Sequence, residues 1–369
     1  MNKLFCIVCM AVFSAACSGS SPSPADSRAT PETCALYRNL FRVADDGVMF
    51  GHQDDALYGH GWKYEEGRSD VRECCGDYPA VFGWELGGLE AGADRSIDDV
   101  PFAEIARLLC AAYGRGAVNT VSWHPQNPES GASAWDCKTT TAVKSILPGG
   151  ANHAEYRSWL DRLAGFFAGL KAADGTLAPV LFRPFHEHTG SGFWWGEAQC
   201  TPDEYRALWR FTVEYLRDVK GVHNLLYVYS PDLYRDAEHY MERYPGDEWV
   251  DVLGLDAYHR QQDWDFLSGG ERMLSTLQRL GREHGKPTAF TETGLEGIPD
   301  AEWWTRWLLP IIRGKGLSYV LVWRNAHDRP THFFGPWHGH VSESDFRKLP
   351  TGNSPFCSKA GCLTCIADN

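Results

Sequence analysis

Two glutamates stand where a chain of this kind could do chemistry. Glu187 ends the apolar run Ala178-Pro-Val-Leu-Phe-Arg-Pro-Phe-His-Glu187, and Glu292 ends the run Pro287-Thr-Ala-Phe-Thr-Glu292. An apolar strand that ends in a carboxylate places that group at the mouth of a sheet, where ligands bind, and not in the core. Two such carboxylates indicate the acid and nucleophile pair of an enzyme that hydrolyses glycosidic bonds.

The composition is compatible with a carbohydrate substrate and argues against nucleic acid. The 369-residue chain has a formal net charge of −13 and no basic run, so nucleic acid is not an expected partner. Its 15 Trp and 15 Tyr residues include more flat apolar faces than a core needs, and such faces suit sugar rings. The length is usual for one α/β barrel with elaborated loops.

Eight apolar runs recur along the chain with helical patterns between them. Continuous apolar runs are typical of parallel strands that are buried on both faces. The runs are Val48–Gln53, Pro79–Glu85, Ala117–His124, Ala178–Phe185, Asn224–Ser230, Val250–Asp256, Pro287–Glu292 and Ser318–Arg324. Eight strand–helix units predict an α/β fold, a TIM (β/α)8 barrel that forms a single catalytic domain over residues 33–349.

Several intervening segments have clear helix signals. Asn152–Ala173 carries an apolar stripe at helical spacing, and Thr201-Pro-Asp-Glu204 is a capping box with proline at the first helical position. Gly270–His284 and Asp300–Arg313 also predict helices, and we expect Pro310 to kink the second.

The N-terminus predicts export. Residues 1–16 form a signal peptide, with a short basic start and an apolar stretch too short to span a bilayer permanently. Ser14-Ala-Ala-Cys17 resembles a bacterial lipobox with Cys17 as the lipidated residue; ordinary signal-peptidase cleavage is the alternative. Residues 17–32 are Ser/Pro-rich and predict a flexible tether. The tether has no acidic run, so we expect an exported bacterial lipoprotein on the periplasmic face of the outer membrane, touching the membrane only through its lipid anchor.

The cysteine pattern leaves the covalent framework open. Of 12 cysteines, Cys6, Cys9 and Cys17 belong to the export signal, and the nine that remain are an odd number. Export makes disulfides plausible, but their pairing cannot be read from sequence. The Cys-rich tail over residues 350–369 is expected to form a disulfide with Cys34 or elsewhere rather than a metal knuckle, because no His or second CxxC follows it.

The residues at the carboxyl ends of the predicted strands are mostly carboxylates, imidazoles and indoles. Active residues of a barrel lie at these ends. The set is His52, Gln53, Trp84, Glu85, Trp123, His124, His186, Glu187, Ser230, Asp232, Asp256, Tyr258, Glu292, Trp323 and Arg324. It lacks the HxH and Lys of a metal-dependent amidohydrolase and any Gly-rich phosphate cradle, so no metal and no cofactor is expected.

Six motifs in chain order resemble glycoside hydrolase family 26, a β-mannanase family of the retaining clan whose catalytic glutamates lie on strands four and seven. The motifs extend over the chain from about Gly51 to Asn325, and His186 before Glu187 is diagnostic because most of that clan has Asn there. The motifs are Trp123-His-Pro-Gln-Asn-Pro128, Arg183-Pro-Phe-His-Glu187, Phe193-Trp-Trp-Gly196, Tyr244-Pro-Gly-Asp247, Asp251-Val-Leu-Gly-Leu-Asp-Ala-Tyr258 and Thr291-Glu-Thr293.

The resemblance implies a role for each strand-end residue. Glu187 is implied to be the acid/base, and Glu292 the nucleophile that forms a covalent glycosyl-enzyme. In retaining enzymes the two carboxyls lie about 5–5.5 Å apart. Arg183 and Tyr258 are implied to hold Glu292 in its charged form through hydrogen bonds.

Further residues are implied to line the site of the sugar whose bond is cleaved. Trp323 would form an apolar floor, and His124 and His186 would donate hydrogen bonds to sugar hydroxyls or to Glu187. Of two adjacent tryptophans, which point apart, Trp195 is expected to face the substrate.

One departure from the family pattern bears on the leaving-group site. Gly192 stands where relatives often carry an aromatic just before Phe-Trp-Trp. The lack of an aromatic side chain at position 192 puts sugar stacking in the leaving-group site in doubt.

The implied activity is that of a retaining endo-β-1,4-mannanase acting on mannan, galactomannan or glucomannan by double displacement. The family also leaves open a chain-end enzyme that releases mannobiose, or one that cuts mixed-linked β-glucan or β-1,3-xylan. The expected partner is β-mannan polysaccharide or oligosaccharide; the oligomeric state is open, with a monomer as the default.

Two other classes of protein compete with the glycosidase. A non-catalytic sugar-binding lipoprotein is disfavoured because such a protein usually loses one catalytic carboxylate, and both are present. A metal-dependent deacetylase, suggested only by Trp123-His-Pro, lacks the remaining ligands.

Overall fold

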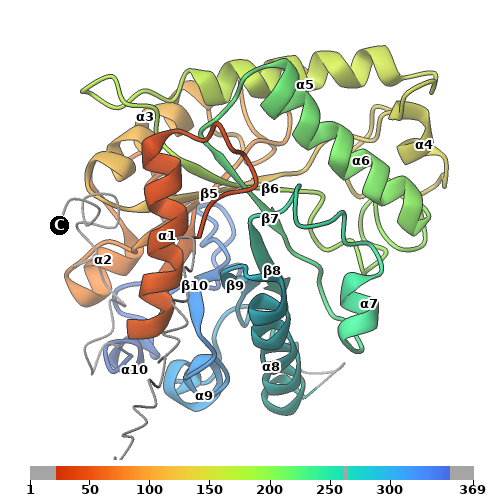
Figure 1. Cartoon of the computed structure of the whole chain (residues 1–369). Helices are drawn as coiled ribbons and strands as arrows, with labels where there is room; N and C mark the ends of the chain where they lie inside the picture. The colour runs from red at the N-terminus through yellow and green to blue at the C-terminus, as the bar shows by residue number, and fades with distance from the viewer. Residues whose placement is uncertain (1–21, 261–264, 350–369) are drawn as a thin grey trace, which may run out of the picture.

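The computed structural model describes residues 22–260 and 265–349. Its eight main strands are β1 Met49–Gln53, β4 Val81–Glu85, β5 Val118–Trp123, β6 Val180–Pro184, β7 Leu225–Tyr229, β8 Val252–Asp256, β9 Thr288–Thr293 and β10 Leu317–Val322. They close into a parallel barrel in the order β1, β10, β9, β8, β7, β6, β5, β4 (Figure 1). Every residue in these strands is buried. The predicted TIM barrel and all eight predicted strands are confirmed.

Helices surround the barrel, and most follow a strand (Figure 1). They are α1 Pro31–Asp46, α2 Asp70–Cys75, α3 Phe102–Gly114, α4 Ala142–Ile146, α5 His153–Ala168, α6 Pro202–Glu214, α7 Ala237–Met241, α8 Phe266–His284, α9 Leu309–Ile312 and α10 Glu343–Phe346. Two π-helical turns, η1 Tyr215–Val219 and η2 Trp304–Leu308, continue α6 and precede α9. A short hairpin, β2 Tyr58–Gly59 with β3 Trp62–Lys63, follows β1 and was not predicted. No helix of the described ranges has the length and apolar content needed to cross a bilayer.

Helix α1 closes the N-terminal end of the barrel. Leu36 and Leu40 belong to the same buried cluster as Met49 and Val118, which lie at the start of their strands. The hydroxyl of Ser318 donates a hydrogen bond to the carbonyl oxygen of Leu40, 2.9 Å away. The opposite end of the barrel, where the strands finish, is therefore the end that can hold a site.

Two predicted helices have different lengths in the structure. Helix α5 ends at Ala168 and not at 173, because the chain turns there into a bridge between Lys171 and Leu177. Helix α8 begins at Phe266, four residues before the predicted start, because the side chain of Asp265 accepts the backbone N–H groups of residues 267 and 268.

The predicted capping box at the start of α6 is confirmed. The Thr201 side chain accepts the N–H of Glu204, while the Glu204 carboxylate accepts the N–H of Thr201, so the capping box of α6 is complete. Pro310 lies where the helix changes from the π-helical turn η2 to the single α-helical turn α9, and the predicted kink stays a prediction. Proline lacks the N–H that a continuous helix would need at this point.

Part of the predicted flexible tether over residues 17–32 is wrong, because it packs on the barrel. From residue 22 onward the chain packs against the barrel: the N–H of Ala25 donates to Asp251 at 2.7 Å, and Asp26 contacts His223 at 2.7 Å. Helix α1 already begins at Pro31, with Thr30 as its cap. The signal peptide, Cys17 and the tail at 350–369 lie outside the described residues.

Five cysteines of the described ranges form no disulfide, namely Cys34, Cys74, Cys110, Cys137 and Cys200. The predicted partner of Cys34 lies in the tail, so that prediction is not tested.

Candidate active site

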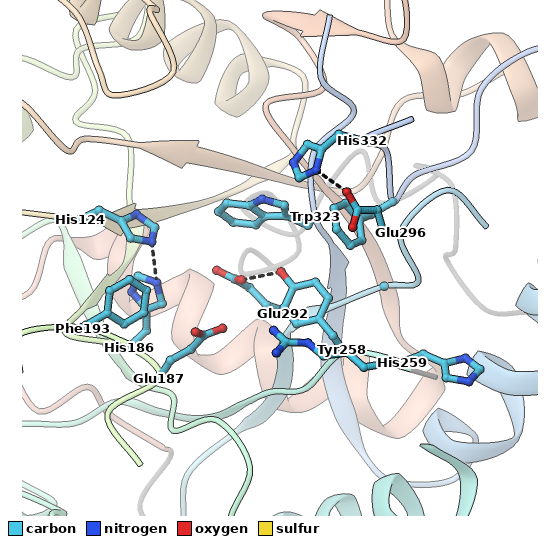
Figure 2. Close-up of a pocket in the computed structure, with 13 residues that line it drawn as sticks. His124, His186, Glu187, Phe193, Tyr258, His259, Glu292, Glu296, Trp323 and His332 are labelled. Atoms are coloured by element: carbon cyan, nitrogen blue, oxygen red, sulfur yellow. Dashed lines mark hydrogen bonds and ion pairs between the residues drawn. The ribbon is translucent and has the colours of Figure 1, made fainter. Parts of the chain in front are cut away.

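A pocket of about 390 Å³ lies at the carboxyl ends of the strands, and both predicted catalytic glutamates line it (Figure 2). Glu187 follows β6, and Glu292 lies within β9. Four more predicted residues share this pocket, namely His124 after β5, His186 after β6, Tyr258 after β8 and Trp323 after β10. The barrel thus gathers residues from five strands around one cavity.

Both carboxylate oxygens of Glu292 have donors. The Tyr258 hydroxyl donates to one oxygen at 2.7 Å, and the Arg183 guanidinium binds the other. The pairing of β8 with β9 shifts register just before Asp256, which then lies opposite Glu292. Such an irregularity re-aims a side chain. These contacts favour the charged carboxylate that a nucleophile requires.

Arg183 lies beneath Glu292 and not on the pocket wall. Its side chain is 3% exposed, and its second nitrogen binds Asp256 at 2.6 Å. Burial disfavours the charged guanidinium, but the carboxylates of Asp256 and Glu292 outweigh it and raise the pKa of Arg183 above its usual value. Arg183 thus contacts Glu292, as the resemblance implies, and is not among the residues that line the pocket.

Glu187 has very different surroundings. The backbone reaches it through two residues in the left-handed region, Phe185 with φ 49° and Glu187 itself with φ 52°. The N–H of Glu187 donates to the Ser230 carbonyl at 2.9 Å, which fixes this turn to the end of β7. Burial, and then the negative charge of Glu292, raise the pKa of Glu187 well above its usual value. A carboxyl that keeps its proton beside one that is held charged is the arrangement expected of an acid and a nucleophile.

The two imidazoles form a chain that starts at Glu85. The Glu85 carboxylate contacts His124 Nδ1 at 2.7 Å and also accepts the His124 N–H and the Ser122 hydroxyl. A carboxylate only accepts, so His124 Nδ1 carries the hydrogen, and His124 Nε2 lies 3.0 Å from His186 Nε2. The described contacts thus join the imidazoles to each other and to Glu85, with none to Glu187, contrary to one of the expected arrangements.

The two imidazoles differ in pKa. Burial opposes a charge on His124, but Glu85 outweighs it and raises the pKa of His124. Burial and the nearby Arg183 charge hold the pKa of His186 well below its usual value. Of the two imidazoles, His124 is therefore the one that takes up a proton more readily.

Trp195 does not face the pocket, so its predicted role in contacting sugar is wrong. It is fully buried, and its Nε1 donates to the His186 carbonyl at 2.8 Å. Its ring stacks at 4.6 Å on Phe193, and Phe193 is the residue that lines the pocket. Trp194 is equally buried, so both tryptophans support the loop from behind.

Trp135 is a candidate site residue that the sequence analysis did not identify. It lies in the loop after β5, is 53% exposed, and stacks near-parallel to His124 with ring centres 5.3 Å apart. It also lies 5.7 Å from Phe193. Its indole offers an aromatic face near the place where Gly192 supplies none. A tryptophan in a Gly/Ser-rich loop has no strand-end position that would single it out.

The described residues contain no group of three or more His, Cys, Asp or Glu side chains that could hold a metal ion.

The chain has clear relatives. Residues 25–269 match the family model described as glycosyl hydrolase family 26. A mannan endo-1,4-beta-mannosidase of Bifidobacterium adolescentis is 34% identical over 365 residues, covering 92% of this chain and 36% of that protein. One of Bacillus subtilis is 30% identical over 287 residues and covers 74% of each. The chain thus spans only about a third of the length of the Bifidobacterium relative.

Solved structures agree over nearly the whole chain. A family 26 beta-mannanase from Bacteroides ovatus has 47% identity and a TM-score of 0.86, covering 88% of this chain and 94% of that one. The catalytic domain of an endo-beta-1,4-mannanase from Bacillus sp. JAMB-750 has 32% identity and a TM-score of 0.86, covering 94% and 97%. The family model, the relatives and the barrel agree with the resemblance read from the motifs: the chain belongs to glycosyl hydrolase family 26.

Proposed function

We propose that this protein is a retaining endo-β-1,4-mannanase that cleaves internal bonds of mannan, galactomannan or glucomannan. The observation that carries the proposal is the pair Glu187 and Glu292 in one pocket, the first with a raised pKa and the second held by Arg183 and Tyr258. The similar proteins from Bifidobacterium adolescentis and Bacillus subtilis are mannan endo-1,4-beta-mannosidases, which supports β-1,4-mannan as the substrate.

In the first step Glu292 attacks the anomeric carbon and Glu187 gives its proton to the leaving oxygen. A covalent glycosyl-enzyme forms, and the shortened chain departs. Once neutralised as an ester, Glu292 no longer raises the pKa of Glu187. Glu187 is then a better base, and it takes a proton from the water that releases the sugar.

The other residues divide into two groups. Arg183 and Tyr258 are positioning residues that hold the Glu292 carboxylate by both oxygens. His124, Phe193 and Trp135 lie on the Glu187 side, where the leaving part of the chain must pass. Trp135 supplies a flat face for a sugar there, which offsets the absence of an aromatic at position 192.

Export and lipid attachment at Cys17, with the barrel on the periplasmic face of the outer membrane, belong to the proposal on sequence grounds alone. A Cys17→Ala variant that still incorporates labelled fatty acid would remove this part of it.

The test of substrate is a product profile over time on linear mannan, galactomannan, mixed-linked β-glucan and β-1,3-xylan. Manno-oligosaccharides of mixed size from mannan, with nothing from glucan or xylan, are expected. Mannobiose as the only early product would replace the endo mode with chain-end release. Cleavage of glucan or xylan but not mannan would overturn the substrate.

A further inference from the structure

The pocket has a second end that the chemistry above does not use. It is lined by Glu296 from the loop after β9 and by His332 and Phe334 from the loop after β10. Figure 2 shows His332 and Glu296 on the far side of Trp323 and Glu292 from His124, His186 and Glu187. The two ends of the pocket are therefore separated by the reacting centre.

The position of Glu187 gives this second end a direction along the substrate. The acid must lie next to the leaving oxygen, so the leaving sugar lies on its side, beside His124 and Trp135. The sugar that precedes the reacting one on the non-reducing side, in subsite −2, must then extend toward Glu296 and His332.

Glu296 and His332 form a polar pair at this end. His332 Nδ1 lies 2.7 Å from Glu296 Oε1, with the two side chains 22% and 58% exposed. Burial lowers the pKa of His332 below its usual value despite its bond to Glu296, and the charges of Arg329 and Arg324 lower it further. The ring is therefore neutral at neutral pH.

The protonation of this pair determines what it offers to a ligand. Because a carboxylate only accepts, the hydrogen of neutral His332 resides on Nδ1, and Nε2 keeps a lone pair. The Nε2 atom and the second Glu296 oxygen are two hydrogen-bond acceptors at the pocket wall. Sugar hydroxyls are the donors that suit them, with Phe334 edge-on to the imidazole at 5.3 Å as an apolar neighbour.

The backbone holds the pair independently of its side chains. The N–H of Ala326 donates to the His332 carbonyl, and the His332 N–H donates to Arg329, each at 2.9 Å. The N–H of Gly297 donates to the Phe333 carbonyl at 2.8 Å and so ties the two loops together. A wall that is already formed before a ligand arrives loses little conformational entropy on binding.

We propose that Glu296 and His332 are the hydroxyl-binding wall of subsite −2 and make catalysis depend on a second sugar on the non-reducing side. The inference rests on the proposed function for the direction of the chain, but not for the identity of the sugar.

The experiment compares dinitrophenyl β-mannobioside with dinitrophenyl β-mannoside. The mannobioside fills subsite −2 and subsite −1, which is the site of the reacting sugar, whereas the mannoside fills subsite −1 alone. Both substrates have a leaving group that needs little acid assistance. The readout is the ratio of the two kcat/KM values. His332→Ala is expected to lower this ratio roughly fivefold to tenfold, the size of one lost hydrogen bond, mainly through the mannobioside.

His338→Ala is the matched control. His338 lies on the same loop as His332, and its Nδ1 contacts Oε1 of Glu343 at the start of α10 at 3.0 Å, but neither residue lines the pocket. This variant is expected to keep the wild-type ratio. Glu296→Gln is a second test should the alanine variant melt early, and a smaller fall in the ratio is expected because the carbonyl still accepts the Nδ1–H.

Three outcomes would overturn the inference: a ratio that His332→Ala and Glu296→Gln leave unchanged, an equal loss on both substrates, or an equal fall in the control. If the wild-type enzyme hydrolyses the glucose counterparts and not the mannosides, the proposed function fails. The same ratio measured with those glucosides still decides the role of the pair.

Discussion

Replacing Arg183 with methionine tests the link between the fold and the charged state of Glu292. The guanidinium is 3% exposed and binds both Asp256 and Glu292, which are themselves almost fully buried. Methionine keeps much of the volume but leaves two carboxylates without their cation. We expect a large loss of stability and of activity in the same variant.

The size of the expected stability loss follows from the burial of the ion pair. Removing one partner of a buried ion pair costs about 3–5 kcal/mol, because the remaining charge stays buried. For a chain of this size each kcal/mol lowers the melting temperature by about 2 °C, so a fall of roughly 6–10 °C is expected.

The loss should also depend on pH. Burial already raises the pKa of Asp256 well above its usual value, and the Arg183 charge opposes that rise. Without the cation the pKa of Asp256 rises further above its unfolded value, so the folded variant binds more protons than the wild type. Its stability relative to wild type must fall as pH rises through that range. The deficit at pH 8 is therefore expected to exceed the deficit at pH 5.

The assay is denaturant unfolding at both pH values, with kcat on a dinitrophenyl β-mannobioside measured beside it. Arg279→Met is the control, because Arg279 pairs with Glu283 on the surface of α8 with both side chains about half exposed. A surface pair of this kind contributes at most a few tenths of a kcal/mol. An Arg183→Met enzyme as stable as the control, or one whose deficit is the same at pH 5 and pH 8, would refute the reasoning.

Three further predictions concern catalysis. Glu187→Ala should lose about 10²–10⁴-fold on mannan but far less in the first step on a dinitrophenyl glycoside, whose leaving group needs no acid; equal losses would speak against an acid. Trp135→Ala should lower kcat/KM on mannotetraose about fivefold, the value of about 1 kcal/mol of aromatic contact, while mannobiosyl fluoride, whose leaving group carries no ring, is unaffected; no change on the tetraose would remove Trp135 from the leaving-group site. Burial raises the pKa of Asp232 to about 6, and its charge helps to raise the pKa of Glu187. Asp232→Asn should therefore shift the alkaline limb of the pH–rate profile to lower pH, and an unmoved limb would show that this charge does not act on Glu187.

The barrel could be predicted from sequence because each strand is buried on both faces. Burial of that kind leaves a continuous apolar run, and a polar residue at its end is then conspicuous. Glu187, Glu292 and His124 were identified in this way. The loops carry no comparable constraint, so the hairpin at β2 and β3 was not predicted.

Side-chain direction in the loops was the part that sequence could not supply. Trp195 turns inward, where its Nε1 donates to the His186 carbonyl and its ring stacks on Phe193, and no pattern of apolar residues records these contacts. The stacking of Trp135 on His124 and the hydrogen bond between Glu85 and His124 each join two different segments of the chain, so neither contact has a local sequence signal. The Ser/Pro-rich segment around Asp26 was predicted to be flexible from composition alone, and its partly buried contact with His223 has no local signal.

The central claim is that Glu292 forms a covalent bond with the sugar. A 2-deoxy-2-fluoro mannobiosyl fluoride should glycosylate such an enzyme quickly, with release of fluoride, and the glycosyl-enzyme should hydrolyse slowly, so mass spectrometry of the intact protein and its peptides can locate the adduct. The account predicts one added glycosyl group, on the peptide that contains Glu292, and none in Glu292→Gln. An enzyme that turns over mannan yet acquires no adduct, or carries it on another residue, would contradict the account.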